Sequence, residues 1–217
     1  MASKSFCSSF PSLSPVKVGR TEDMAQHLLR LRSRVTEAFL PNRGRVLEIG
    51  PGEVGYDRKG CDVVAVNIST RGNPQVFADG QALPFRAGSF DAVIATEVIE
   101  HVRYPFRLLQ EVRRVLRPAG RALVSTPNVA TPVNRIALAA FGEFPDDRTL
   151  HDGQDVGHLH FFTRRSFLEA ARSHGFAVAR EWDFLLQVFP SRYVYDTALE
   201  RVFPNHAKIV MLELSPV

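Results

Sequence analysis

Several features are scarce in this chain of 217 residues, and each scarcity excludes a class of protein. The chain has only two cysteines, Cys7 and Cys61, which lie far apart, so neither a disulfide framework nor a cysteine-rich zinc site is expected. No apolar run approaches the roughly 20 residues that a membrane-spanning helix requires. We therefore expect a protein without a membrane span that resides in the reducing cytoplasm.

The charge of the chain gives little support for a nucleic-acid partner. The formal net charge is +4 and the isoelectric point is about 9.4, a basic balance that raises the question. Much of the excess comes from arginines on one predicted helix, where a solvated face is a sufficient explanation. These are Arg107, Arg113, Arg114 and Arg117. No nucleic-acid-binding motif accompanies them, and we predict no nucleic-acid partner.

The length of the chain fits one domain preceded by a short arm. A chain of this size can build one sizeable core but has no room for a second full domain. Residues 1–20 are rich in serine and contain no acidic residue, which predicts a flexible arm; an organellar transit peptide is the alternative interpretation. Residues 21–217 form the predicted domain.

Segments with helical and strand patterns alternate along this domain. Apolar residues recur at helical spacing in 24–39, 108–116 and 163–174, with a short patch at 136–141, and we expect the second helix to end at Pro118. Short apolar segments predict strands at 45–49, 62–66, 76–78, 90–95, 121–125, 176–184 and 209–214. The alternation predicts an α/β fold, a single Rossmann-like domain with a doubly wound, mostly parallel sheet. Ligands bind such sheets at the carboxyl ends of the strands.

A glycine-rich turn follows the first predicted strand. Gly50, Gly52 and Gly55 fit the G-x-G-x-x-G spacing, which lets a backbone turn tightly and approach a ligand without obstruction by Cβ atoms. Only residues 56–60 separate this turn from the next predicted strand, which leaves room for hardly more than one helical turn. A dinucleotide-binding fold places its pyrophosphate at the N-terminus of a full helix here, so a nicotinamide oxidoreductase is a disfavoured alternative.

Acidic residues near the turn favour a cationic ligand. S-adenosylmethionine has no phosphate, and its ammonium and sulfonium groups are cationic, so carboxylates suit it better than a helix dipole does. Glu48, near the end of the first strand, and Glu97, after the fourth, are placed to supply them. The alternative for Glu48 is a strand-end carboxylate that is hydrogen-bonded to backbone amides.

Five ordered segments resemble class I S-adenosylmethionine-dependent methyltransferases. They are residues 46–52, 78–85, 89–102, 111–120 and 158–163. Within that superfamily they most resemble the group that acts on small molecules, which includes quinone-biosynthesis methyltransferases. The resemblance spans roughly residues 45 to 180, and five ordered motifs are far more specific than one glycine loop.

The resemblance implies a sheet of seven strands with the last strand antiparallel, S-adenosylmethionine as cofactor and S-adenosylhomocysteine as product. Together with the residues above, the predicted cofactor contacts are Glu48, Gly50, Gly52, Gly55, Asn67, Ile68, Asp79, Gly80, Thr96 and Glu97. In this assignment Asp79 accepts a hydrogen bond from the adenine amino group, the Gly80 amide meets a ring nitrogen and Ile68 stacks on the ring. Thr96 and Glu97 border the methionine part. The alternative for Asp79 is a turn former, since Asp-Gly is a common turn pair.

Two positions depart from the family pattern. The helix after the glycine turn is truncated, although the stretch from Gly50 to Cys61 still meets the rough minimum of about 10 to 12 residues for a parallel crossover. Asn67 stands where the family usually has a carboxylate that accepts both ribose hydroxyls, and an amide offers one acceptor and one donor group. A charge-assisted hydrogen bond contributes about 1.5 to 3 kcal/mol against about 1 for a neutral one, so the affinity for cofactor is expected to be roughly tenfold weaker.

Methyl transfer to a small-molecule acceptor depends mainly on positioning. The displacement is in line, with the nucleophile about 3 to 3.5 Å from the methyl carbon. A hydroxyl acceptor would be helped by a general base, and histidine is suited because its pKa is near neutral. The candidates are His101, His158 and His160. For His101, a hydrogen bond at a helix start is the alternative.

The connection at 127–160 is longer than a minimal one and predicts a lid insertion after the fifth strand that binds the acceptor. His158 and His160 could bind a metal with Asp152 and Asp155, but no further convincing ligand follows, and we predict no metal site.

An alternative function is a catalytically silent binding module or partner subunit, which the truncated helix and Asn67 could mark. The protein could also form a homodimer.

Overall fold

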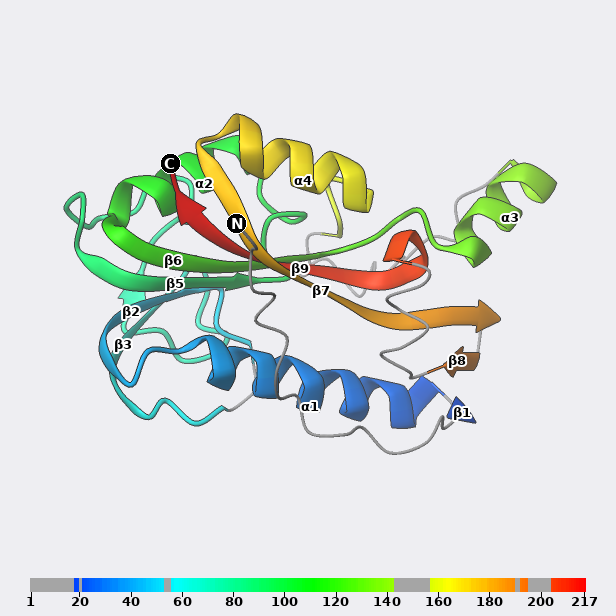
Figure 1. Cartoon of the computed structure of the whole chain (residues 1–217), viewed down its shortest axis with the longest axis horizontal. Helices are drawn as coiled ribbons and strands as arrows, with labels where there is room; N and C mark the ends of the chain where they lie inside the picture. Colours follow the sequence, from blue (N-terminus) through cyan, green and yellow to red (C-terminus); the bar gives the residue numbers. More distant parts are fainter. Residues whose placement is uncertain (1–17, 20, 53–55, 143–156, 190–191, 195–203) are drawn as a thin grey trace, which may run out of the picture.

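One twisted sheet lies between two layers of helices (Figure 1). The computed structural model describes residues 18–19, 21–52, 56–142, 157–189, 192–194 and 204–217. The strands are β1 (Val18–Gly19), β2 (Arg43–Ile49), β3 (Gly60–Asn67), β4 (Val76–Phe77), β5 (Phe90–Thr96), β6 (Leu116–Pro127), β7 (Phe176–Phe189), β8 (Arg192–Val194) and β9 (Ala207–Pro216). The helices are α1 (Thr21–Phe39), α2 (Pro105–Val115), α3 (Pro132–Phe141), α4 (Arg164–Ser173) and the short 3₁₀ turn η1 (Pro204–His206).

The strands follow the order β1-β8-β7-β9-β6-β5-β2-β3-β4. Neighbours from β6 through β5, β2 and β3 to β4 are parallel, and β9 is antiparallel to both β6 and β7. Because β7 and β6 both oppose β9, β7 runs in the same direction as the five parallel strands. The seven predicted strands and the antiparallel direction of the last one are therefore confirmed.

Two short strands that the sequence did not predict extend the sheet beyond β7. β8 pairs with β7, and β1 pairs with β8 through Val18↔Val194 and Gly19↔Tyr193. Residues 18 and 19 belong to the predicted arm, so this part of the arm is a strand; the rest of the arm lies outside the described residues. Segments of two or three residues carry no readable periodicity, and only their pairing partners make them strands.

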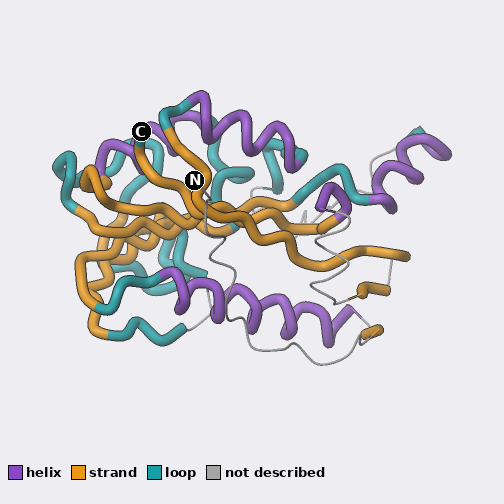
Figure 2. The backbone as a smooth tube through the Cα atoms, viewed as in Figure 1, coloured by secondary structure: helices purple, strands orange, loops and turns teal. Residues whose placement is uncertain are grey.

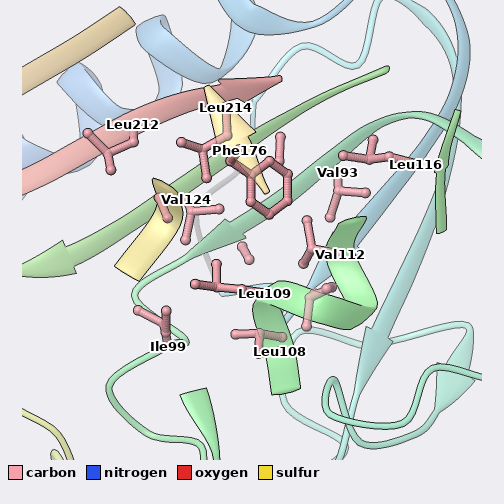
Figure 3. Packing of buried hydrophobic residues seen from close by; sticks show 14 of the residues in the cluster. Val93, Ile99, Leu108, Leu109, Val112, Leu116, Val124, Phe176, Leu212 and Leu214 are labelled. Carbon is pink, nitrogen blue, oxygen red and sulfur yellow. The ribbon is translucent and has the colours of Figure 1, made fainter. Parts of the chain in front are cut away.

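The larger hydrophobic core lies between the sheet and the helices α2 and α4. Leu108, Leu109 and Val112 of α2 are fully buried in one cluster with Phe176 and Val124 of the sheet (Figure 3). Each such buried side chain contributes about 1.5 to 3 kcal/mol relative to an exposed one. Figure 2 shows the strands as one continuous layer beneath these helices.

The opposite face of the sheet is covered by α1. Val35 and Phe39 of α1 pack on Val46, Ile94 and Met211 of the sheet. Helices on both faces make the sheet doubly wound, as predicted. The described residues of the connections from β2 to β5 contain no helix, so the predicted truncation of the helix after the glycine turn is confirmed for residues 56–59.

The predicted end of the second helix was wrong. α2 ends at Val115, and Leu116 has extended backbone angles and pairs with Phe90 as the first residue of β6. Pro118 disfavours helical angles at the residue before it, and the pairing resumes at Arg121 after an irregularity. The helix therefore ends at Val115, three residues before Pro118.

The connection after β6 contains a short helix, α3. Thr131 caps its first turn by accepting from the backbone N–H of Asn134, and Gly142 ends it in a left-handed conformation with φ +69°. α3 extends away from the sheet, and none of its side chains is buried (Figure 1). Residues 143–156 of the predicted lid lie outside the described part of the chain.

α4 follows the prediction closely. Thr163 and Ser166 form a reciprocal capping box at its start, and His174 and Gly175 follow its last turn. None of the helices that the structure describes is long and apolar enough to cross a membrane.

Candidate functional site

The predicted site residues gather at the carboxyl edge of the parallel strands. Gly50 follows β2, Asn67 ends β3 and Thr96 ends β5. Because β3, β2 and β5 are adjacent and parallel, these three strand ends lie side by side. The edge is the position at which sheets of this type bind ligands.

The turn after β2 requires glycine at its first position. Gly50 has a φ of +64°, which side chains other than glycine rarely adopt, and its N–H donates to the Val66 carbonyl at 2.8 Å. A Cβ atom at Gly50 would lie 2.7 Å from Cγ2 of Val98. Gly52 is exposed, and Gly55 lies outside the described residues. The turn therefore packs directly against the segment that follows β5.

Glu48 lies beside the short loop after the glycine turn. Its side chain is buried, and burial raises its pKa above the ordinary value, while the neighbouring Tyr56 hydroxyl and Arg58 guanidinium partly offset this rise. The Arg58 Nη2 atom is 4.0 Å from Glu48 Oε2. Burial, and next the Glu48 charge, raises the pKa of Tyr56. Among the described residues, the side chains of Tyr56 and Arg58 from the loop after β2 lie beside Glu48.

The end of β5 is held in an unusual backbone conformation. Glu97 has a φ of +55°, and its N–H donates to the carbonyl and hydroxyl oxygens of Ser125 on β6. The Ser125 hydroxyl in turn donates to Glu97 Oε1 at 2.7 Å. A left-handed residue other than glycine costs about 1 to 3 kcal/mol and occurs preferentially at functional sites.

A cation from α1 completes this group. Arg32 Nη2 donates to Thr96 Oγ1 at 2.9 Å. The side chain of Thr96 therefore bridges the sheet to α1, and a guanidinium lies next to the carboxyl-rich end of β5. Sequence reasoning missed Arg32, although a signal was present: Arg32 falls four residues after Leu28 and three before Val35, within the apolar stripe of the helix.

The side chain of Asn67 forms hydrogen bonds within the loop after β3. Its Nδ2 donates to the Arg71 carbonyl at 2.8 Å, and its Oδ1 accepts from the backbone N–H of Ile68. Ile68 itself is 76% exposed. An apolar side chain that projects from a strand end is available for stacking on a planar ring, whereas the amide of Asn67 is engaged by its own loop.

Asp79 and Gly80 form a tight turn after β4. Asp79 Oδ1 accepts from the backbone N–H and the side-chain amide of Gln81, and Oδ2 accepts from the same amide. A Cβ atom at Gly80 would lie 3.0 Å from both Ile49 and Leu108. The turn-forming role of Asp79 is therefore present, and close packing against β2 and α2 explains the glycine.

The three predicted histidines do not share one environment. The rings of His101 and His158 lie edge to face with centroids 4.8 Å apart. His160 instead places Nε2 3.2 Å from the Arg103 carbonyl oxygen. Asp152 and Asp155, considered with the histidines as metal ligands, lie outside the described residues.

A buried carboxylate that the sequence interpretation did not use lies next to the histidine pair. Glu100 is 1% exposed, and its Oε1 is 3.9 Å from Nε2 of His101. Burial, and next the charge of Glu97, raises the pKa of Glu100 well above its ordinary value. The pattern Glu-His after β5 was visible, but the depth of Glu100 was not.

Comparison with known proteins identifies the family of this chain. Residues 20–181 match the model of a family described as a methyltransferase domain. An uncharacterized methyltransferase from Mycobacterium sp. strain KMS is 34% identical over 118 residues, which cover 48% of this chain and 46% of that protein. The chain thus spans about half the length of the curated relatives it matches.

Solved structures share the fold at low sequence identity. A possible histamine N-methyltransferase of Thermotoga maritima has a TM-score of 0.57 and 18% identity, covering 90% of this chain and 95% of that one. The 1,6-didemethyltoxoflavin-N1-methyltransferase of Burkholderia thailandensis, solved with 1,6-didemethyltoxoflavin and S-adenosylhomocysteine, has a TM-score of 0.58 and 16% identity, covering 90% and 80%.

Proposed function

The chain belongs to the methyltransferase-domain family, and from that premise we propose that it binds S-adenosylmethionine and transfers its methyl group to a small-molecule acceptor. The product of the cofactor is S-adenosylhomocysteine.

The arrangement of opposite charges at the end of β5 carries this proposal. The methionine part of the cofactor has an ammonium, a sulfonium and a carboxylate. Glu97, in its left-handed conformation beside the turn at Gly50, offers a carboxylate to the cationic groups. Arg32 offers its guanidinium to the carboxylate, which would compete with Thr96 for its N–H groups. Both charges of the cofactor's zwitterionic end therefore have a partner within one site.

The adenosine part fits the ends of β3 and β4. A carboxylate has about four lone-pair sites, and Gln81 uses three of those on Asp79, so one site on Oδ2 is left for the adenine amino group. Ile68 supplies an exposed apolar surface for the ring. Asn67 meets the ribose only if it gives up its bond to Arg71, which agrees with the expectation of weak binding.

His101 and His158 mark the acceptor side of the site. His101 follows β5 and His158 lies near the end of the predicted lid, and either imidazole is a suitable acceptor for the proton of an attacking hydroxyl. Much of the catalysis comes from holding the nucleophile in line with the methyl group. We further propose residues 127–160 as the segment that covers the acceptor; the exposed side chains of Ile136 and Phe141 on α3 supply apolar surface for it.

A small acceptor also agrees with the names of related proteins. The enzyme from Burkholderia thailandensis named above is a methyltransferase that was solved with the small molecule 1,6-didemethyltoxoflavin bound. A biotin biosynthesis bifunctional protein of Cellvibrio japonicus is 31% identical over 135 residues, which cover 54% of this chain and 27% of that protein.

Calorimetry and methyl transfer test the proposal together. Purified protein should release or absorb heat with S-adenosylmethionine and with S-adenosylhomocysteine, and Glu97→Gln should weaken both interactions at least about tenfold, since hydrogen bonds to charged groups are worth about 1.5 to 3 kcal/mol. Glu169→Gln is the matched control, because Glu169 pairs with Arg165 on the exposed surface of α4.

Transfer of a radiolabelled methyl group to extracts of small molecules then separates an enzyme from a silent module. Labelled product should appear with the wild type and fall with Glu97→Gln. Binding without transfer to any acceptor would favour the silent module, and absence of binding to both forms of the cofactor would overturn the proposal.

A further inference from the structure

Three potential metal ligands converge beside the proposed acceptor position. Glu100 and His101 follow β5 directly, whereas His158 comes from a segment more than fifty residues later. The backbone N–H groups of Leu159 and His160 both donate to the Glu100 carbonyl, at 2.8 and 3.1 Å. These two bonds fasten the later segment to the end of β5 and bring His158 to the other two side chains.

The carboxylate of Glu100 is buried, and no described residue gives it a hydrogen bond of good geometry. Its side chain is 1% exposed, and neither oxygen accepts a hydrogen bond from any residue that the structure describes. The Thr126 hydroxyl, which is also buried, lies beside this carboxylate. Glu97 places a second negative charge near Glu100, and the guanidinium of Arg32 places a positive charge near it. A buried carboxylate in this state is stabilised by a proton or by a metal ion.

We propose that Glu100, His101 and His158 bind a divalent transition-metal ion. One donor atom from each of the three side chains lies within 4.8 Å of the others, and Glu100 Oε1 is 3.9 Å from His101 Nε2. Bonds of about 2.0 to 2.2 Å to a common ion require donors about 3 to 4 Å apart, so small side-chain rotations complete the site.

The donor set indicates which ions fit. Two imidazoles and one carboxylate suit Zn²⁺, Fe²⁺, Co²⁺ or Ni²⁺, whereas Mg²⁺ and Ca²⁺ prefer sites made of oxygen ligands. Three protein ligands leave at least one coordination position open, as in catalytic zinc sites. This site differs from the pairing of His158 and His160 with two aspartates that was considered and rejected from the sequence, because His160 bonds to the Arg103 carbonyl instead.

The ion would have two effects. It would neutralise the repulsion between Glu97 and Glu100, and it would hold the segment around His158 against the end of β5. The open position suits a water or an acceptor oxygen, and this last role rests on the proposed function. With the ion bound, the two imidazoles are metal ligands and no longer serve as proton acceptors. The ion instead lowers the pKa of the water or acceptor oxygen at the open position.

Cobalt binding tests the inference without cofactor or acceptor. The full chain, freed of metal by a chelator and dialysed, should bind one equivalent of Co²⁺ with visible absorption bands of a site with nitrogen and oxygen ligands, and Zn²⁺ should abolish the bands by displacement. After Zn²⁺ has displaced Co²⁺ and unbound metal has been removed by dialysis, elemental analysis should find one Zn²⁺ per chain.

Variants identify the ligands. Glu100→Gln and His158→Asn should each weaken Co²⁺ binding more than about tenfold, because loss of an outer partner of a ligand alone costs about 10- to 100-fold. His160→Asn is the matched control: it lies two residues from His158, outside the cluster, and should bind Co²⁺ like the wild type. If Glu100→Gln fails to fold, the partly exposed His158 still decides the outcome.

Two results would overturn the inference. One is a wild type without a stoichiometric metal ion in both measurements, and the other is a His158→Asn variant that binds Co²⁺ as tightly as the His160→Asn control. Because neither measurement contains S-adenosylmethionine, a failed methyl-transfer assay with intact Co²⁺ binding would count against the proposed function alone.

Discussion

Asp183 on β7 should make the protein less stable as the pH rises through neutrality. Its side chain is 12% exposed, and it shares the guanidinium of Arg164 with a second carboxylate, that of Glu181. The Arg164 guanidinium contacts Glu181 at 2.5 and 2.7 Å but reaches Asp183 only at 3.9 Å. Asp183 Oδ1 is buried and accepts no hydrogen bond from the described residues. Asp183→Asn removes the charge and keeps the shape.

The size of the expected loss of stability follows from the pKa of Asp183. Burial, and next the charge of Glu181, raises the pKa of Asp183 from 3.8 to about 7. The folded chain therefore keeps a proton that the unfolded chain loses near pH 4, and stability falls with rising pH across this window. At about 1.4 kcal/mol for each pH unit, the cost approaches about 4 kcal/mol above pH 7. The asparagine variant should recover about half of it, about 2 kcal/mol, after relaxation.

Thermal unfolding at two pH values measures this difference. At pH 8 Asp183→Asn should melt about 4 to 8 °C above the wild type, since about 1 kcal/mol corresponds to about 2 to 4 °C in a chain of this size. At pH 5 the wild-type carboxyl is already protonated, and the two proteins should melt together. Glu169→Gln, in an exposed ion pair on α4, is the control and should change little at either pH.

The pH dependence is the decisive part of the result. An equal shift at pH 5 and pH 8 would assign the effect to packing or hydrogen bonding rather than to the charge. A variant that melts below the wild type at pH 8 would mean that Arg164 stabilises the ionised Asp183 by more than burial penalises it, and the reasoning would then be wrong.

Three further predictions concern the cofactor site. Asn67→Asp should tighten S-adenosylmethionine binding by up to about tenfold, because a carboxylate accepts both ribose hydroxyls; unchanged or weaker calorimetric affinity would contradict this placement. Arg32→Gln should weaken binding about 10- to 100-fold while Arg30→Gln, on the same helix, leaves it unchanged, and equal affinities would remove Arg32 from the site. Gly50→Ala should lose about 1 to 3 kcal/mol in urea unfolding, through its positive φ and the contact with Val98, and an unaltered midpoint would refute the strained turn.

Much of the fold could be predicted because burial leaves a repeated signal along each element. Val46 to Ile49 are all buried, as expected for a strand covered on both faces, and Thr163 and Gly175 bracket α4 with local hydrogen bonds. The short strands β1 and β8 could not be predicted, since their pairing involves residues about 175 positions apart. The early end of α2 depends on the pairing of Leu116 with Phe90, which lies outside the helix and its local sequence pattern.

The site was predictable to a different degree at each position. Gly50 was, because a positive φ and a close backbone approach both require glycine. The partners of Asn67 and Asp79 were not, since whether a polar side chain serves a ligand or its own turn depends on the loop conformation. His158 and His160 look equivalent in the chain, but backbone bonds to the Glu100 carbonyl direct the first toward His101 and the second away.

By itself, the sequence determined the α/β class, the glycine turn and the family, because these depend on patterns within a few residues. Tertiary structure alone decided which charges meet. Arg32 reaches Thr96 from another layer, and Glu100 becomes a buried carboxylate only when the chain folds over it. Burial and electrostatic partnership are properties of the space around a residue, and that space is filled by residues distant in the chain.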